Sequence, residues 1–299
     1  MTKTTDISVG WAIALIRSLH SRRDLVSYFA IFALVIHGFQ MQQKYLSDLA
    51  VLSNVGIGEG AFLLKLKAEG IAPTVLPGQF VEVRVDGGNG VFLRRPISIH
   101  NYDEETRELE LLIRKVGKGT EALSHCKPGD SLSIVLPLGN GFDVSTAGRR
   151  PLLVGGGVGV APLLLLAKEL KKRESAPVFL LGSKTKGDLL RLTEYEAAAE
   201  VGLATEDGSA GVKGFVTDHK FLSPDGIKEF TAVLQCGPTP MMKAVAAKAQ
   251  AADIPCFASL ENKMACGFGV CLCCVTETVN GNKRVCADGP VFNVKDLKW

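Results

Sequence analysis

Four cysteines near the C-terminus have the spacing of a metal-cluster site. Cys266, Cys271 and Cys274 form a C-x4-C-x2-C pattern, and Cys286 follows after eleven further residues. This is the plant-type spacing for a [2Fe-2S] cluster, in which four thiolates bind two irons. The pattern predicts that these four side chains are the cluster ligands, and that Cys273, which lies between two of them, points away.

The residues around these cysteines suit a loop that wraps around a cluster. Gly267 and Gly269 can adopt the φ angles that such a loop demands. The pair Asn280-Gly281 predicts a two-residue hairpin in which Val275 lies opposite Cys286. The fourth ligand thereby returns to the level of the third, if a bulge or an early strand end turns both to the same side.

Zinc binding and disulfide bonding have less support from the cysteine pattern. Structural zinc usually binds paired C-x2-C knuckles, and the sequence has one such pair. Eight cysteines in 299 residues are sparse for a disulfide scaffold, and their crowding at one end favours ligation in a reducing compartment. Cys126 and Cys256 are interpreted as packing residues.

Two segments of the first half could bind a flavin. In LRRPISI, residues 93–99, the proline places the strand at a sheet edge, where Arg95 can bind a diphosphate and Ser98 a flavin ring or ribose. Gly117, Gly119 and Thr120 open a short helix whose free amides can bind phosphate. Taken alone, residues 93–99 are equally explained as an edge strand with a surface arginine. Gly117, Gly119 and Thr120 are equally explained as an ordinary glycine turn with a threonine cap.

Two glycine-containing loops follow apolar strands in the second half. LLVGGGVGVAP, residues 152–162, departs from G-x-G-x-x-G, and CGPTPMM, residues 236–242, follows another strand. Both loops should lie at the carboxyl edge of the sheet, where ligands bind. There Cys236 approaches a nicotinamide or, alternatively, is a small residue in a tight turn. The predicted nucleotide-binding residues are Gly155, Gly156, Gly157, Gly159, Cys236, Gly237 and Pro238.

Three successive segments must position these motifs. Residues 44–147 contain short strands broken by glycine and proline, which predicts an antiparallel β-sandwich or small barrel. Residues 148–253 alternate strands with helices, which predicts an open, mostly parallel α/β sheet. Residues 254–299 contain the cysteines and are too short to form a stable core of their own without a cross-link such as a bound metal. The expected strands of the first segment are 61–69, 79–85, 108–116 and 131–139. In the second segment, strands are expected in LLVGG, APVFLLGSK and TAVLQCGPTP, and helices after the glycine loop of residues 152–162 and over 194–201 and 241–252.

Composition and charge exclude some classes of function. The net charge of +3 comes without a clustered basic excess, so no nucleic-acid surface is expected. Leu25–Phe39 is an apolar run of 15 residues behind Arg22 and Arg23, whereas a membrane-spanning helix needs about 20. We expect no membrane span and interpret residues 1–40 as a doubtful extension upstream of Met41, with a signal anchor as the alternative.

The order of these motifs resembles that of the ferredoxin reductase-like flavoproteins. These have a flavin barrel with R-P-x-S, followed by a nucleotide domain with G-G-G-x-G-x-A-P and C-G-P. More narrowly, SLENKMACGFGVCLCC followed by VCADGPVF resembles the electron transfer subunits of NAD-dependent (type B) dihydroorotate dehydrogenases. The resemblance runs from about Lys44 to the end of the chain.

The resemblance implies a multi-domain β plus α/β protein with FAD, NAD and [2Fe-2S] sites. It assigns residues 44–147 to an FAD-binding barrel, 148–253 to an NAD-binding domain and 254–299 to the cluster. It places FAD against Arg95, Pro96, Ile97, Ser98, Leu112, Ile113, Arg114, Gly119 and Thr120.

The resemblance also implies a partner and a pathway for the electrons. The partner is an FMN-containing catalytic subunit that oxidises dihydroorotate in cytoplasmic pyrimidine biosynthesis, in a two-plus-two heterotetramer. Electrons then pass through the cluster and FAD to NAD.

Two alternative functions fit parts of the pattern. An NADPH-linked ferredoxin reductase or an oxygenase reductase component has a similar layout. In the NADPH-linked family an aspartate often replaces the first cluster cysteine, whereas this chain has Cys266 at that position, which favours the dihydroorotate dehydrogenase family. Lys184, Lys186 and Arg191 either bind a 2′-phosphate or lie on a solvated face. A zinc-stapled binding module without redox activity is the alternative from another class, and it would be colourless.

Overall fold

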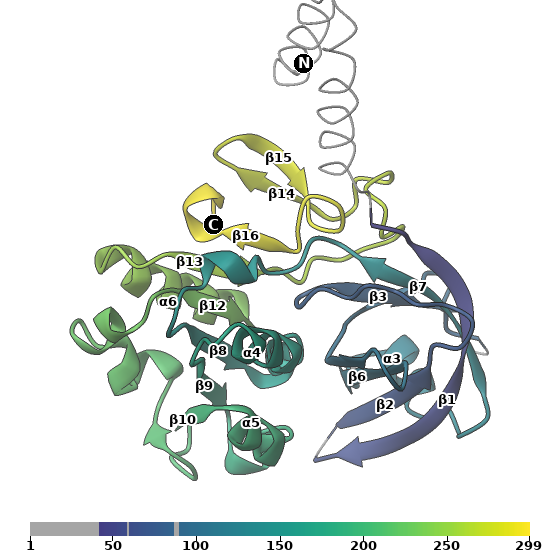
Figure 1. Cartoon of the computed structure of the whole chain (residues 1–299), viewed down its shortest axis with the longest axis horizontal. Coiled ribbons are helices and arrows are strands. Elements are labelled where there is room, and N and C mark those ends of the chain that lie inside the picture. The colour runs from purple at the N-terminus through teal and green to yellow at the C-terminus, as the bar shows by residue number, and fades with distance from the viewer. Residues whose placement is uncertain (1–41, 59, 87–89) are drawn as a thin grey trace, which may run out of the picture. The chain divides into compact units, whose positions relative to one another are not determined.

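The computed structural model describes residues 42–58, 60–86 and 90–299. The predictions for residues 1–40 therefore lie outside the described residues. Lys44–Trp299 forms one structural unit, which contains two seven-stranded sheets and a two-stranded hairpin (Figure 1). No helix in the described part of the chain is long and apolar enough to cross a membrane.

The first sheet is antiparallel and curls into a half barrel (Figure 1). Its strand order is β4-β3-β7-β1-β2-β6-β5, so β4, which contains Pro96, lies at the edge, as predicted. The four strands expected from the sequence are present as β2, β3, β6 and β7. The elements of this part are β1 (Tyr45–Ile57), β2 (Ala61–Lys67), β3 (Phe80–Val83), β4 (Arg95–Ser98), β5 (Asn101–Asp103), β6 (Glu108–Arg114), α3 (Lys118–Leu123), β7 (Ser131–Leu138) and η1 (Val144–Thr146).

Strands β2 and β6 are buried on both faces. Leu64 and Leu111 point into the barrel core, whereas Leu63 and Leu112 belong to a second apolar cluster that includes the helices of the neighbouring sheet. The barrel wall is thus packed against the second sheet's helices, and the two halves share a buried interface.

The second sheet is parallel except at one edge. Its order is β11-β10-β9-β8-β12-β13-β16, and β16 alone runs antiparallel to its neighbour, β13. Helices α4 and α5 lie on the side of the sheet opposite to α6 (Figure 1), which explains why β8 and β12 are buried throughout. The strands and α-helices are β8 (Leu152–Gly156), α4 (Leu163–Lys172), β9 (Val178–Ser183), α5 (Leu192–Ala198), β10 (Glu200–Thr205), β11 (Val212–Lys213), β12 (Val233–Cys236), α6 (Thr239–Ala251), β13 (Cys256–Ser259) and β16 (Val291–Asn293). The short 3-10 helices are η2 (Gly157–Val160), η3 (Lys186–Asp188), η4 (Val216–Asp218), η5 (Lys220–Leu222), η6 (Gly226–Glu229) and η7 (Val294–Asp296).

One expected helix is shorter than predicted. The expected helix at 194–201 ends at Ala198, and the chain enters β10 at Glu200. The expected helix at 241–252 is present as α6.

The hairpin after the cysteine loop has a different register from the predicted one. Strands β14 (Val275–Thr278) and β15 (Gly281–Arg284) pair with Val275 opposite Arg284, not opposite Cys286. Gly281, with φ +90°, begins β15 opposite Thr278, so the two turn residues are Val279 and Asn280, and not Asn280 and Gly281. Moving the turn by one residue shifts the register by two residues, and β15 ends before Cys286.

Candidate functional site

The cysteine loop wraps its backbone amides around the sulfur atoms. Gly267 and Gly269 have φ angles of +72° and +79°, as the sequence predicts for such a loop. The amide of Phe268 donates to Cys266 Sγ at 3.4 Å, and the amide of Gly269 donates to Cys286 Sγ at 3.1 Å. Amides directed at sulfur stabilise the thiolate form and adjust the reduction potential of a metal cluster bound by the thiolates.

The four predicted ligands form two pairs of sulfur atoms. Cys274 Sγ lies 3.2 Å from Cys286 Sγ, and the Cys271 thiol hydrogen-bonds to Cys266. Among the described residues, no group of three or more such side chains is placed to hold a single ion. Two pairs of thiolates are the donor set that a two-iron cluster needs, so these residues fit a [2Fe-2S] group.

The sulfur environment favours a thiolate at the first ligand. Partial burial raises the pKa of Cys266, but amide hydrogen bonds from Cys271, Phe268 and Val270 outweigh it and lower this pKa to about 6. In the other pair, burial and the Cys274 thiol raise the pKa of Cys286 to about 12. A metal ion would have to displace that proton in order to bind.

The other cysteines have different surroundings. Cys273 Sγ lies 3.6 Å from the carbonyl oxygen of Lys263, on an exposed part of the loop. Cys256 is buried, and Gln235 Nε2 donates to its sulfur at 3.5 Å. Cys126 is half-buried near the end of α3.

The two predicted flavin segments lie side by side. Arg95 lies against Gly119, where an added Cβ would come within 2.9 Å of Arg95 Cδ. Both residues line a surface cavity of about 420 Å³ together with Gly117 and Thr120. The amides of Lys118, Gly119 and Thr120 lie in the first turn of α3 and have no intrahelical acceptor. The residues that form this cavity fit the diphosphate of FAD.

The flavin ring itself has a backbone surface available. Strand β6 pairs with β2 along its whole length, but β5 covers its other edge over Glu108–Glu110 alone. The edge of residues 111–114 therefore has no strand partner in the described sheet. Leu112 and Ile113 are each 2% exposed, so a flavin lying along β6 would meet their backbone, not their side chains. Pro96, Ile97 and Ser98, in β4, are half-buried.

A buried carboxyl group lies between β4 and the cysteine loop. Glu82, in β3, pairs with Pro96, is 1% exposed, and has no hydrogen-bond partner for either carboxyl oxygen among the described residues. Burial raises the pKa of Glu82 to about 7, although Arg95 and Arg94 act to lower it. A Cβ at Gly267 would lie 2.8 Å from Glu82 Cγ.

The two glycine loops of the second sheet meet backbone to backbone. β8 and β12 are parallel neighbours, so their loops emerge at the same edge, as predicted. A Cβ at Gly159 would lie 2.5 Å from Gly237 Cα, and a Cβ at Gly156 would lie 2.8 Å from Pro238 Cδ. Cys236 is 0% exposed, and its sulfur lies 3.7 Å from Glu261 Oε1. Burial raises the pKa of Cys236 well above its usual value, so this side chain remains a thiol.

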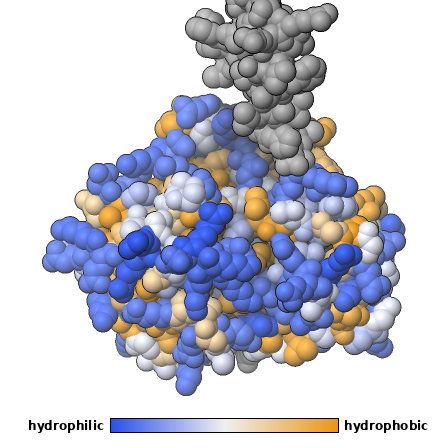
Figure 2. All heavy atoms as spheres, viewed as in Figure 1, coloured by the Kyte–Doolittle hydropathy of each residue, from blue (hydrophilic) through white to orange (hydrophobic). Residues whose placement is uncertain are grey.

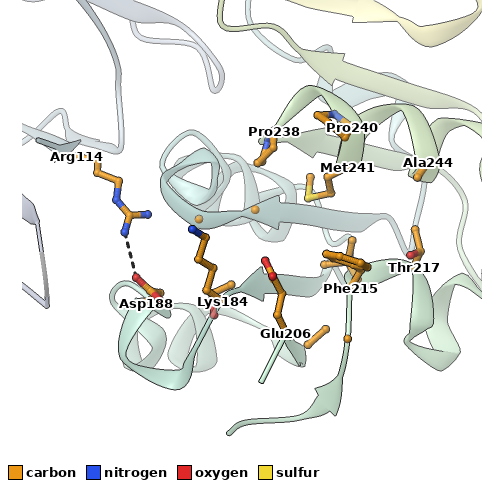
Figure 3. Close-up of a pocket in the computed structure, with 17 residues that line it drawn as sticks. Arg114, Lys184, Asp188, Glu206, Phe215, Thr217, Pro238, Pro240, Met241 and Ala244 are labelled. Carbon is orange, nitrogen blue, oxygen red and sulfur yellow. Dashed lines mark hydrogen bonds and ion pairs between the residues drawn. The ribbon is translucent and has the colours of Figure 1, made fainter. Parts of the chain in front are cut away.

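These loops border a cavity of about 500 Å³, which Figure 3 shows. Of the predicted residues, Gly156, Gly157, Pro238 and Arg114 line it. Arg114 reaches from β6 of the barrel and forms an ion pair of 3.0 Å with Asp188 of η3. An extended nucleotide fits such a cavity, because glycines allow its phosphates to approach the backbone. Lys184, considered from the sequence as a possible 2′-phosphate ligand, also lines it. Lining residues that the sequence interpretation missed are Glu206, Phe215, Thr217 and Met241.

The surface around these sites is polar on one face of the molecule. Figure 2 shows this face with hydrophilic residues over most of its area and apolar residues scattered among them. Several large apolar side chains are nevertheless exposed at the cysteine loop, namely Phe268 (47%), Val270 (80%) and Leu272 (61%).

Comparison with known proteins identifies the three parts of the chain. Residues 51–142 match the oxidoreductase FAD-binding domain, and residues 153–247 match the oxidoreductase NAD-binding domain. Residues 261–298 match the iron-sulfur cluster binding domain of dihydroorotate dehydrogenase B. The expected fold class and set of cofactor domains are thereby confirmed.

Curated relatives and a solved structure agree with these domains. The chain is 39% identical over 255 residues to the electron transfer subunit of dihydroorotate dehydrogenase B (NAD(+)) from Geobacillus sp. (strain WCH70), covering 84% of this chain and 97% of the relative. It is 38% identical over 258 residues to the subunit of the same name from Fusobacterium nucleatum subsp. nucleatum, covering 85% and 98%. A chain in the structure of an NADH-dependent reduced ferredoxin-NADP oxidoreductase matches with a TM-score of 0.75 and 32% identity, over 84% of this chain and 90% of that one.

The resemblance seen in the cysteine segment is thus confirmed over most of the chain. With its FAD-binding and NAD-binding domain matches and its paired cysteines in one structural unit, the chain belongs to the family of electron transfer subunits of dihydroorotate dehydrogenase B.

Proposed function

We propose that this chain passes electrons from the FMN of a catalytic partner subunit, which oxidises dihydroorotate, through [2Fe-2S] and FAD to NAD. The observation that carries the proposal is the continuity of the three sites: the cysteine loop contacts β3, which pairs with the proposed flavin strand β4, and Arg114 at the end of β6 lines the nucleotide cavity. When bound, the cluster carries single electrons, and the flavin exchanges both single electrons and hydride, which transfer to NAD requires.

Direct contacts join the cysteine loop to the barrel. Gly267 lies against Glu82 of β3, and β3 pairs with the flavin strand β4. On the other side of the loop, Asn140 at the end of β7 donates from its backbone to Gly289 O at 2.6 Å and from Nδ2 to Ala287 O at 3.0 Å. Both ends of the cysteine segment are therefore held against the barrel, which fixes the distance between the proposed cluster and the flavin.

A second set of contacts joins the barrel to the nucleotide cavity. Arg114 leaves β6 at the unpaired edge proposed for the flavin, and its Nη1 lies 3.7 Å from the Cβ position of Gly157. The same side chain pairs with Asp188. We assign to Arg114 the role of positioning the nucleotide beside the flavin.

We further propose that the catalytic subunit docks on the cysteine loop. The exposed side chains of Phe268, Val270 and Leu272 surround the proposed ligands, and apolar groups exposed together are typical of protein contacts. A partner bound here would bring its own redox group close to the cluster. The relatives' name, electron transfer subunit, supports a separate catalytic partner, and we propose a two-plus-two assembly.

The cysteines also support the proposed compartment. All eight are free, although Cys274 and Cys286 lie close together. Free thiols persist in a reducing environment, so we propose a cytoplasmic location.

The test is co-expression of the chain with an FMN-containing dihydroorotate dehydrogenase subunit. The purified complex is given dihydroorotate and NAD without oxygen, and NADH formation is followed. We expect NADH formation by the complex and none by either subunit alone. A loaded complex with stoichiometric flavin and iron that forms no NADH would contradict the proposal, and a colourless chain with one zinc would indicate the binding-module alternative.

A further inference from the structure

The carboxylate of Glu206 projects into the nucleotide cavity without a partner. Glu206 follows β10 directly, and its amide donates to Ser183 O at 3.1 Å, which fixes the backbone at the sheet edge. Its side chain lines the cavity and makes no hydrogen bond or ion pair with any described residue. Figure 3 shows this carboxylate pointing inward between Lys184 and Phe215.

An exposed aromatic ring lies next to this carboxylate. Phe215 is 64% exposed and lines the cavity opposite Met241 in Figure 3. Its amide donates to the Asp218 carboxylate at 2.8 Å, so a backbone contact, not burial of the ring, holds Phe215 in place. A flat aromatic face opposite a thioether forms a slot that suits the ring of a nucleobase.

The two cationic side chains of the cavity lie in different places. Arg114 Nη1 lies 3.7 Å from the Cβ position of Gly157, where the phosphates of a dinucleotide would lie, whereas Lys184 lies beside Glu206 (Figure 3). Of the other two cations considered from the sequence, Arg191 lies outside this cavity and pairs with Glu194 at 3.1 Å, and Lys186 is not among the lining residues. Among the described residues, Arg114 and Lys184 are the two cations that line this cavity.

We propose that Glu206 determines the choice of nucleotide: it accepts hydrogen bonds from the adenosine ribose hydroxyls of NAD and repels the 2′-phosphate of NADP. Phe215 and Met241 hold the adenine beside it. A carboxylate is acceptor-only, so it pairs with hydroxyl donors and has an unfavourable interaction with a phosphate dianion. This inference rests on the proposed function, since it concerns the same cavity.

Binding of two ligands that cannot accept electrons provides the test. ADP-ribose and 2′-phospho-ADP-ribose are titrated into the intact protein with its cofactors, and dissociation constants are measured by calorimetry. We expect ADP-ribose to bind at least about tenfold more tightly, a difference of about 1.4 kcal/mol. In Glu206→Gln this ratio should fall by about tenfold, because the charge is lost while the shape is kept. Glu196→Gln, an exposed glutamate on α5 with the same change in charge, should keep the wild-type ratio.

Two further variants separate the roles of the neighbouring residues. Phe215→Ala should weaken both ligands by a similar factor, because the adenine is common to them. Lys184→Gln should also weaken both equally if Lys184 contacts the diphosphate, whereas a loss confined to 2′-phospho-ADP-ribose would overturn the assignment.

Failure of this inference differs from failure of the proposed function. If both ligands bind with equal affinity, or if Glu206→Gln leaves the ratio unchanged, the inference is overturned while the nucleotide site stands. If neither ligand binds to the wild-type protein, the nucleotide site itself is overturned, and the inference with it.

Discussion

Cys274 Sγ and Cys286 Sγ lie 3.2 Å apart, although eleven residues separate them in the chain. The hairpin β14–β15 brings them together, and its turn, in which Thr278 pairs with Gly281, sets the register that does so. A pair of thiols this close can share one metal ion, which makes the hairpin as much a part of the proposed site as the cysteine loop.

Replacement of single cysteines should separate ligands from neighbours. Cys274→Ser and Cys286→Ser should lose nearly all bound iron, because each removes half of a pair. Cys273→Ser is the matched control and should keep its iron, since the Cys273 sulfur contacts Lys263 O. Iron and labile sulfide per chain, together with visible absorption, measure the effect. Iron loss in Cys273→Ser with iron retained in Cys274→Ser would show that the loop binds metal differently.

A side chain at Gly119 should displace the proposed FAD diphosphate. The Cβ would come within 2.9 Å of Arg95 Cδ and would push this side chain into the cavity. We expect Gly119→Val to lower FAD affinity by roughly tenfold, as judged from flavin retained on dialysis. Gly56→Ala, at a glycine of β1 with open space around it, should retain its flavin. Equal flavin content in Gly119→Val and wild type would place the diphosphate elsewhere.

Polar substitutions on the cysteine loop should weaken association with the catalytic subunit. Phe268→Ser removes an exposed aromatic side chain, the kind of residue that contributes most to interfaces. The dissociation constant of the complex should rise by about tenfold, and iron content should stay unchanged. Val55→Ser, at an exposed apolar residue on β1, is the control and should bind as the wild type does. Unchanged binding by Phe268→Ser would count against docking at this loop.

The pH dependence of stability should report the burial of His100. The residue is 0% exposed, its Nδ1 donates to Ala161 O at 2.8 Å, and its Nε2 has no hydrogen-bond partner among the described residues. Burial lowers the pKa of His100 to about 4, from 6.5 in the unfolded chain. The unfolded state therefore takes up the proton first, and stability present above pH 6.5 is lost as the pH falls towards 4.

Replacement of His100 should reduce this loss. We expect the urea midpoint of His100→Gln to fall less between pH 6.5 and 4 than that of the wild type, with the full effect worth at most about 3 kcal/mol. His125→Gln, at an exposed histidine, is the control and should follow the wild-type curve. Identical slopes for His100→Gln and wild type would show that the buried imidazole does not govern this pH range.

The sequence allowed the motifs and their order to be predicted, because each has a local cause. Spacing predicts which cysteines are ligands, and Pro96 correctly predicted that β4 lies at an edge of the sheet. The hairpin register was predicted wrongly because Asn-Gly suits more than one turn type, and the chosen turn depends on how Gly281 fits the strands.

The walls of the nucleotide cavity could not be predicted, because they depend on strands that local pattern did not reveal. The alanine-rich helix pattern at 194–201 continued into Glu200, where β10 begins, so the residue after this strand, Glu206, was not placed at the sheet edge. Arg114 reached the cavity from another domain, and its contact with Asp188 spans 74 residues of sequence. Such contacts follow from the packing of the two sheets, which no local signal encodes.

The pairing of β13 with the edge strand β16 determines how the cysteine-containing segment is attached to the second sheet. The chain leaves the second sheet at Ser259 and returns at Val291, and these two residues are opposite each other in the β13–β16 ladder. The residues between them thus form a long loop whose two ends are held together by the β13–β16 pairing. The entropy cost of closing this loop is therefore met by the sheet and not by metal binding to the cysteines. An insert attached in this way can be exchanged for a short turn while the nucleotide-binding sheet stays continuous.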